Sequence, residues 1–176
     1  MIRNLHEREI VAPVREVGLL IDSLASTDDR LWPRDKWPAM RLNGPLGVGV
    51  AGGHGPVRYF VSEYVPGRYI EFEFTRPEGF NGRHSFTAIP HEADTTLLRH
   101  EILMSTHGTA RFTWPLFYRP LHNALIEDCL DLAERDCGSA EGSPTSRSLW
   151  TRLLRAPISA QLAKRRARSV GRPTEH

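Results

Sequence analysis

Two histidines are the residues whose type and spacing best suit them for chemistry. His84 lies in the segment RHSFTAI at residues 83–89, and His100 lies in TTLLRHEILMS at residues 95–105. A short turn at Pro90–Asp94 would make these segments antiparallel neighbours and bring the two imidazoles within one or two cross-strand positions. Imidazoles titrate near neutral pH, so the pair could serve as general acid and base in an aldol-type cyclisation or dehydration.

A phenol and a carboxylate join this pair in one of two possible strand registers. The segment VRYFVSEYV at residues 57–65 is followed by the turn signal Pro66-Gly67. A two-residue turn there would point Tyr59, Val61 and Glu63 inward. A β-bulge would instead turn Phe60, Ser62 and Tyr64 inward, because side chains alternate along a strand. The first register adds Tyr59 and Glu63 to the candidate site.

The residues expected around these polar groups are mostly apolar. The strand RYIEFEFTR at 68–76 alternates cleanly, and its apolar positions predict one inward face. The same reasoning applies to the two histidine-bearing strands and to the final helix. The predicted lining consists of Ile70, Phe72, Phe74, Phe86, Leu98, Ile102, Met104, Tyr118, Leu121 and Leu125, with Ala88 sharing the face of His84. An apolar pocket with a few convergent polar groups is the usual composition of a ligand site.

The histidines also allow a purely structural interpretation. Each could satisfy a local hydrogen bond or lie at the rim of the pocket, and the catalytic role is the narrower hypothesis. The other histidines, at positions 6, 54, 91, 107, 122 and 176, are interpreted as surface or loop residues.

The elements that position these groups follow from periodicity. A strand is expected at 5–11, then a helix from Pro13 to about Ser26 with Val14, Val17, Ile21 and Leu24 on one stripe. Residues 27–40 allow one or two short helical turns, and 46–51 is expected to be a strand followed by a turn at Gly52–Gly55. A long helix is predicted over about 112–135, with Asp128, Asp131 and Glu134 on or beside its exposed side.

Composition excludes several classes of protein. There is no apolar run of the roughly 18 residues that a membrane span needs, and the charged N-terminus does not resemble a signal peptide, so a cytoplasmic location is expected. The sequence lacks GxSxG, HExxH and Walker-type motifs, and neither a metal site nor a cofactor is predicted. Cys129 and Cys137 would be about 12 Å apart on one helix, which is too far for a disulfide.

Charge is distributed unevenly along the chain. Residues 1–137 carry 15 Lys+Arg and 19 Asp+Glu, whereas residues 138–176 carry 8 Lys+Arg and 2 Asp+Glu. Residues 138–146 have linker composition, and a short helix is expected before Pro157. We therefore expect residues 1–137 to form the domain and 138–176 to form a linker and basic tail, partly disordered. No specific nucleic-acid partner is predicted, because the basic excess belongs to the tail and lacks interleaved aromatic residues.

The tail has an amphipathic segment that suits weak contact with an anionic membrane or a protein. Its apolar residues are Leu149, Trp150, Leu153 and Leu154, and its basic residues are Arg147, Arg152, Arg155 and the cluster at 164–168. A solvated extension with no partner is the alternative.

An early strand, two short helices, a run of antiparallel strands and a long final helix is an unusual order. It resembles the helix-grip fold of the START-like (SRPBCC) superfamily, which includes the birch-pollen allergen family and polyketide cyclase/dehydrase-like proteins. The resemblance covers roughly residues 4–137 and rests on the joint at 10–17, the strand pair VRYFVSEYVPGRYIEFEF, the segment 82–86 with its following hairpin, and the final helix.

The resemblance implies an α+β fold in which a curved antiparallel sheet wraps a long C-terminal helix around a cavity for a hydrophobic small molecule. The expected function is binding or transport of a lipid, polyketide or isoprenoid. One alternative is a cyclase or dehydratase that uses His84 and His100 without a cofactor. A second is a ligand-sensing regulator whose basic tail contacts a membrane or partner.

Overall fold

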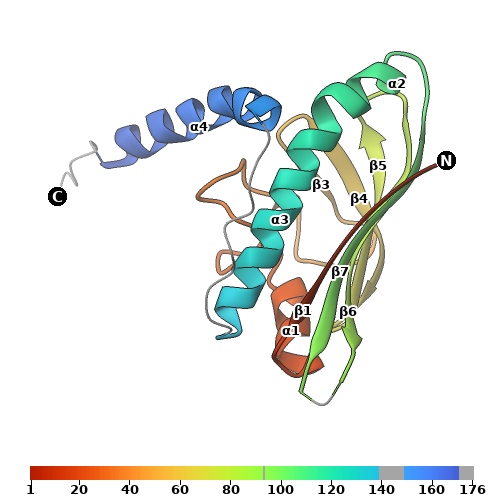
Figure 1. Cartoon of the computed structure of the whole chain (residues 1–176), viewed down its shortest axis with the longest axis vertical. Helices are drawn as coiled ribbons and strands as arrows, with labels where there is room; N and C mark the ends of the chain where they lie inside the picture. Colours follow the sequence, from red (N-terminus) through yellow and green to blue (C-terminus); the bar gives the residue numbers. More distant parts are fainter. Residues whose placement is uncertain (93, 139–148, 171–176) are drawn as a thin grey trace.

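A curved antiparallel sheet forms one side of the molecule (Figure 1). The computed structural model describes residues 1–92, 94–138 and 149–170. In these residues seven strands lie in the order β1-β7-β6-β5-β4-β3-β2. The strands are β1 (Ile2–Ile10), β2 (Arg41–Leu42), β3 (Ala51–His54), β4 (Val57–Val65), β5 (Tyr69–Arg76), β6 (Phe80–Pro90) and β7 (Thr96–Thr106). The N-terminal strand β1 pairs antiparallel with β7, the last strand in the sequence, and so forms one edge of the sheet.

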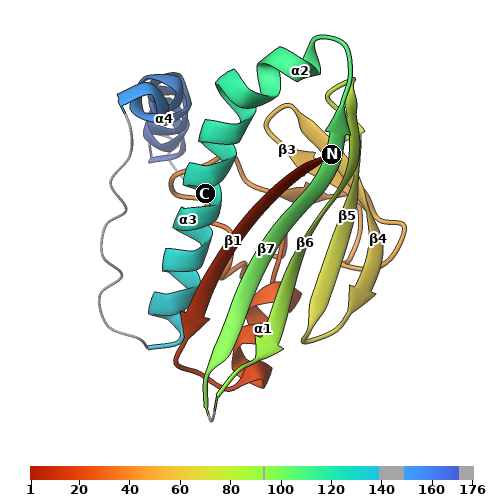
Figure 2. The same ribbon diagram turned by 45° about the vertical axis from the view of Figure 1, so that its right-hand side comes forward.

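The concave face of the sheet holds the helices (Figure 2). After β1 comes α1 (Val14–Asp22), and after β7 comes a continuous helical run made of α2 (Ala110–Thr113), η1 (Trp114–Tyr118) and α3 (Arg119–Asp136). Five residues of π-helix at η1 accommodate Pro115 and Pro120, whose rings disrupt regular α-helical bonding. The α+β arrangement of a curved sheet around a long helix is confirmed.

The segment between α1 and β2 differs from the prediction. Only one of the two short helices expected after the first strand is present, because residues 27–40 form turns rather than a helix. Asp29 organises these turns by accepting hydrogen bonds from the backbone N–H groups of Ala25, Leu31 and Trp32. A carboxylate that binds three backbone donors substitutes for helical bonding.

The glycine-rich segment also folds differently. A strand was expected at 46–51 and a turn at Gly52–Gly55, but β3 spans Ala51–His54 and the turn lies at residues 55–56. The glycines allow close approach of backbones: a Cβ at Gly52 would lie 2.1 Å from the carbonyl oxygen of Arg41, and one at Gly53 would lie 2.1 Å from that of Val57. Glycine is therefore required inside this strand by packing.

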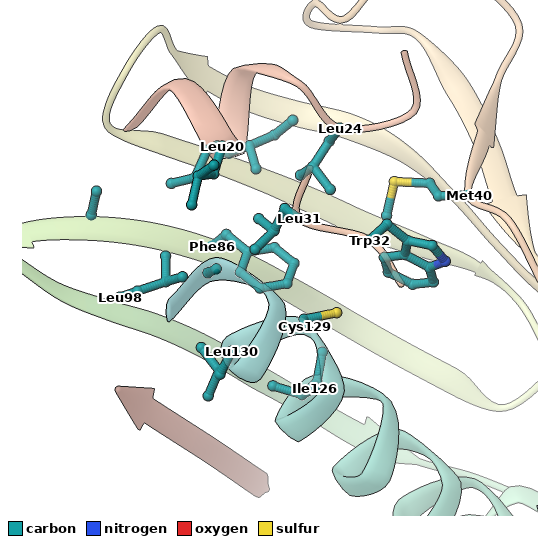
Figure 3. Close-up of a cluster of buried hydrophobic side chains, with 14 of the residues drawn as sticks. Leu20, Leu24, Leu31, Trp32, Met40, Phe86, Leu98, Ile126, Cys129 and Leu130 are labelled. Carbon is teal, nitrogen blue, oxygen red and sulfur yellow. The ribbon is translucent and has the colours of Figure 1, made fainter. Parts of the chain in front are cut away.

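The main hydrophobic core fills one end of the concave face (Figure 3). Side chains from α1 and from residues 27–40 meet the sheet and the C-terminal half of α3 there. The buried members drawn and labelled are Leu20, Leu24, Leu31, Trp32, Met40, Phe86, Leu98, Ile126, Cys129 and Leu130. A smaller cluster of Phe80, Ile102, Met104, Ala110 and Trp114 lies under α2 and η1. The two clusters leave room between them on the concave face.

The C-terminal helix α4 (Leu149–Val170) is longer than expected. The predicted helix stopped before Pro157, but the observed helix continues through that residue. Its first half packs beside α3, where Thr151 is buried and Ile158 contacts the main core. The predicted linker at 138–146 lies outside the described residues except for Gly138, as do the last residues, 171–176. No helix within the described ranges is both long and apolar enough to cross a membrane.

Candidate ligand-binding cavity

A cavity of about 120 Å³ lies between the concave sheet face, α3 and α4. It occupies the end of the sheet that α1 does not fill. The residues around it are predominantly apolar and aromatic, with histidine as the main polar type. They are Trp32, Trp37, Pro38, His54, Gly55, Pro56, Val57, Phe74, Phe80, His84, His100, Ile102, Trp114, Tyr118, Leu121, His122, Leu125, Ile126 and Ile158.

His84 lies in the cavity wall between aromatic rings. Its ring stacks against Phe72 and Phe74, each with a centroid distance of 4.9 Å, and meets the edge of Tyr59 at 5.0 Å. These neighbours come from β4 and β5, which explains the arrangement: Phe72 is the cross-strand partner of His84, and alternation places Phe74 on the same face. The Nε2 atom of His84 is buried and has no hydrogen-bond partner among the described residues.

His100 and His122 continue the row of imidazoles. The ring of His100 is 5.6 Å from that of His84 and 5.0 Å from that of His122, measured between centroids. The predicted proximity of His84 and His100 is thus confirmed: His100 pairs with Phe86, two residues from His84 on β6. The Nδ1 atoms of His100 and His122 are both buried without a partner in the described part of the chain. Three histidines that line one apolar cavity therefore each have a buried ring nitrogen without a partner among the described residues.

A fourth imidazole, His54, lies at the far wall. Its Nδ1 is 3.1 Å from the hydroxyl of Tyr59, and its ring packs on Trp32 at a centroid distance of 4.6 Å. Tyr59 is buried, and burial raises the pKa of its hydroxyl well above the usual range, so the phenol stays protonated. A protonated phenol can donate its hydrogen bond to this imidazole.

All four imidazoles are held in the neutral form. Burial lowers the pKa of His54 to about 4 and that of His122 to about 3, because the charged form loses hydration. Burial, with the neighbouring histidines acting in the same direction, also lowers the pKa of His84 and His100 well below 6.5. At neutral pH these groups are uncharged donors and acceptors, which suits hydrogen bonding to a neutral ligand better than proton donation.

The predicted site residues separate into two groups. Phe74, His84, His100, Ile102, Tyr118, Leu121 and Leu125 line the cavity. The others that point inward are packed in a core or behind the wall: Tyr59, Val61, Ile70, Phe72, Phe86 and Leu98 belong to the main cluster, and Met104 belongs to the cluster under η1. The division arises because α1 and residues 27–40 fill the other end of the concave face.

The inward orientation predicted for Glu63 is wrong. The pairing of β4 with β5 shifts register between Val61 and Glu63, which leaves Ser62 as the extra residue of a bulge. Tyr59 and Val61 keep the inward face, whereas Glu63 is exposed on the outer one. Beyond the bulge Tyr64 turns inward, and its hydroxyl donates to Asp22 at the end of α1 over 2.8 Å. Each of the two predicted registers therefore holds for part of the strand.

His54 and His122 were wrongly interpreted as surface or loop residues. The sequence contained a signal for His122, because it follows Tyr118 by four residues and precedes Leu125 and Ile126 by three and four, the spacing of one helix face. No comparable signal existed for His54, whose strand was predicted a few residues too early. Trp37, Phe80 and Trp114 are further lining residues that the pattern did not identify.

A wider groove of about 770 Å³ adjoins the cavity. The two share Trp37, Pro38, His54, Gly55 and Ile158 as lining residues, so these residues lie at the boundary between them, which we call the partition. The groove has one wall from the region of β2 and β3 and another from Ile158, Gln161 and Leu162 of α4. Ile158 therefore covers the side of the cavity that faces the groove.

Asp128 anchors this cover. It was expected on or beside the exposed side of the long helix, but it is buried. Its carboxylate accepts hydrogen bonds from Trp37 Nε1 at 2.7 Å and Lys36 Nζ at 3.1 Å, and it lies 3.7 Å from the guanidinium of Arg155. The same guanidinium stacks over Trp37 at 4.7 Å from its ring centroid. One α3 residue thus holds both residues 36–37 and α4.

The described residues contain no group of three or more His, Cys, Asp or Glu that could hold a metal ion. Although His84, His100 and His122 are neighbours, they form a row of tilted rings and do not converge on one point. Cys129 and Cys137 are both free thiols.

Comparison with solved structures identifies the fold. CalU16 from Micromonospora echinospora matches with a TM-score of 0.57 and 16% identity over 91% of this chain and 88% of CalU16. A Thermobifida fusca protein matches at 0.62 with 15% identity over 84% of this chain and all of its own. A norcoclaurine synthase point mutant from Thalictrum flavum, solved with a transition state analogue, matches at 0.57 with 13% identity over 77% and 95%.

No family model matches the sequence, and no curated protein matches it significantly. The likeness is therefore one of structure at low sequence identity, and it covers nearly the whole length of each similar chain. Together with the curved sheet around α3, it shows that the chain has the helix-grip fold, a curved antiparallel sheet around a long helix.

Proposed function

We propose that this protein binds a small, mainly apolar molecule that carries a neutral hydrogen-bonding group. The observation that carries the proposal is that His84, His100 and His122 line an apolar cavity and each have a buried ring nitrogen without a partner in the described part of the chain. A buried polar atom without a partner costs about 1–3 kcal/mol, and a ligand hydroxyl or carbonyl would remove that cost. The apolar wall would supply the remaining affinity.

The size of the cavity narrows the class of ligand. An apolar cavity of roughly 150 Å³ is enough to hold benzene. At about 120 Å³ the present cavity suits a single ring. A lipid, polyketide or isoprenoid would have to extend past Trp37 and Ile158 into the groove. The norcoclaurine synthase structure, which contains a small molecule, supports the use of this fold for ligand binding.

Phenol and toluene test the proposal, because they have the same shape and differ only in the hydroxyl group. We expect phenol to bind about tenfold more tightly than toluene, through one hydrogen bond to an imidazole. His84→Leu or His100→Leu should reduce this preference, whereas His91→Leu, on an exposed loop, should preserve it. NMR titration gives both dissociation constants. Failure of both molecules to bind at millimolar concentration, or an equal affinity for both in the wild type, would refute the proposal.

A cyclase or dehydratase is the second candidate. The observation in its favour is that His84 and His100 lie 5.6 Å apart by ring centroid in the cavity wall, with the protonated phenol of Tyr59 packed behind the wall against the ring of His84. Neutral imidazoles can accept a proton, but a strongly lowered pKa makes them weak bases. Unchanged turnover of a candidate polyketide by His84→Ala and His100→Ala would eliminate this function.

A further inference from the structure

Six large apolar side chains are exposed at the end of the molecule formed by α2, η1 and the start of α4. We call them the apolar patch; they are Phe112, Leu116, Phe117, Leu149, Trp150 and Leu153, with exposed fractions between 44% and 76%. Single exposed apolar residues are common on protein surfaces, but a gathered set usually marks an interaction site.

Trp150 joins the two halves of the apolar patch. Its indole N–H donates to the carbonyl oxygen of Leu116 over 2.8 Å, and its ring lies 6.3 Å from that of Phe117 by centroid. Leu149 and Leu153 are four residues apart on α4, so they lie on the same side of the helix next to Trp150. Figure 1 shows the beginning of α4 beside the upper part of the α2–α3 helical run. The apolar patch is therefore one surface built from two distant segments.

The segments that carry the apolar patch contain only positive charges. Residues 109–126 and 149–170 together have eight Lys+Arg and no Asp or Glu. Arg111, Arg119 and Arg152 are exposed, and none of them forms an ion pair with another described residue. By contrast, residues 1–137 as a whole carry more acidic than basic residues. The charges that adjoin the apolar patch along these segments are thus all positive.

We propose that the apolar patch and its arginines dock on an anionic lipid bilayer. Apolar and aromatic side chains enter the boundary between headgroups and acyl chains, and tryptophan is favoured at that depth. Arginines around them attract anionic headgroups. A second copy of this chain fits less well, because a two-fold contact would bring the positive surface against itself.

The orientation of this surface relates it to the cavity. Trp114 and Tyr118, which line the cavity, belong to the same π-helical turn as Leu116 and Phe117. Docking would place that wall of the cavity next to the bilayer. The docking proposal does not depend on the ligand, however, and binding to vesicles tests it separately from the preference for phenol over toluene.

The experiment measures co-sedimentation of the full chain with vesicles. We expect binding to vesicles of equal phosphatidylglycerol and phosphatidylcholine, and at least tenfold weaker binding to phosphatidylcholine alone. The variant Phe112→Ser/Leu116→Ser/Leu153→Ser should weaken binding about tenfold or more while keeping the Trp150 hydrogen bond, which uses a backbone carbonyl. The charge variant Arg111→Glu/Arg119→Glu should have a similar effect that 0.5 M salt reduces.

Matched controls come from the opposite end of the molecule, around α1. Val11→Ser/Leu19→Ser/Val65→Ser removes three exposed apolar side chains there, and Arg15→Glu/Arg68→Glu makes the same charge change on exposed residues. Both controls should bind vesicles like the wild type. The proposal fails if the wild type does not sediment with anionic vesicles or if the controls lose as much binding as the test variants. It also fails if ultracentrifugation without lipid shows a dimer that the apolar variant abolishes and no vesicle binding occurs.

Discussion

At the scale of single residues, the protein places four imidazoles in surroundings that oppose their protonation. Their environment combines aromatic stacking, burial and mutual proximity. A histidine with these neighbours gains no ion pair in the folded state, in contrast to His6, whose Nδ1 contacts Glu127 over 2.7 Å. The cavity histidines therefore favour folding only when they are neutral.

This arrangement predicts a loss of stability in mild acid. An unfolded histidine has a pKa near 6.5, whereas the folded values for His54 and His122 are about 4 and about 3. Below pH 6.5 the unfolded state binds more protons, so the free energy of unfolding falls as the pH falls towards 4. Each such histidine contributes about 1.4 kcal/mol per pH unit in this range.

Removing one of these histidines should flatten that profile. Between pH 7.5 and pH 5.0, His100→Leu should lose less stability than the wild type, measured by urea unfolding, because burial lowers the pKa of His100 in the folded state. The exposed control His91→Leu should follow the wild-type profile. Parallel profiles for the wild type and His100→Leu would contradict this prediction, because they would show that folding does not lower the pKa of His100.

At the scale of secondary-structure elements, contacts between segments far apart in sequence decide the shape of the site. Residues 36–37, α3 and α4 meet at Asp128, and the cover over the cavity depends on that junction. A buried carboxylate that gathers donors from two other segments cannot be removed without depriving those donors of this acceptor.

We expect Asp128→Ala to lower the free energy of unfolding by about 3 kcal/mol. The buried indole N–H of Trp37 would lose its acceptor, and Lys36 and Arg155 would lose their counter-charge. Asp28→Ala, at an exposed position in the same half of the molecule as residues 36–37, should change stability by less than about 0.5 kcal/mol. Equal stability of the two variants in chemical denaturation would contradict the anchoring role.

Element order and strand alternation predicted the fold and much of the inner face. The pattern at 68–76 and the short turn before β7 were enough to place Phe74, His84, His100 and Ile102 on the concave side. Local patterns failed where non-local packing decided the result. The bulge at Ser62 turned Glu63 outward, and tertiary contacts with Trp37 and Lys36 buried Asp128 on a helix face that its charge suggested was exposed.

At the scale of the whole molecule, the concave face has one filled and one open end. The helix α1 and residues 27–40 pack one end, and the cavity occupies the other, beneath the partition formed by Ile158 and its neighbours. Movement of α4 would widen the side of the cavity that faces the groove, whereas the sheet strands are held by pairing along most of their length.

The partition predicts that Ile158→Asn speeds the release of phenol. Loss of the half-buried apolar side chain should raise the dissociation rate about fivefold, measured by NMR exchange. Ala160→Asn makes a similar polar change at an exposed position on the same helix and should leave the rate unchanged. An unaltered rate in Ile158→Asn would place the route of ligand exchange elsewhere.

The distribution of tryptophan has a practical consequence. The chain contains four tryptophans; Trp32, Trp37 and Trp114 line the cavity, and Trp150 belongs to the apolar patch. Indole emission depends on the polarity around the ring, so occupation of the cavity would change the signal of the first three and contact with lipid would shift that of the fourth. Unlabelled protein thus carries an optical reporter at each of its two proposed binding surfaces, and Trp150→Phe would separate the two signals.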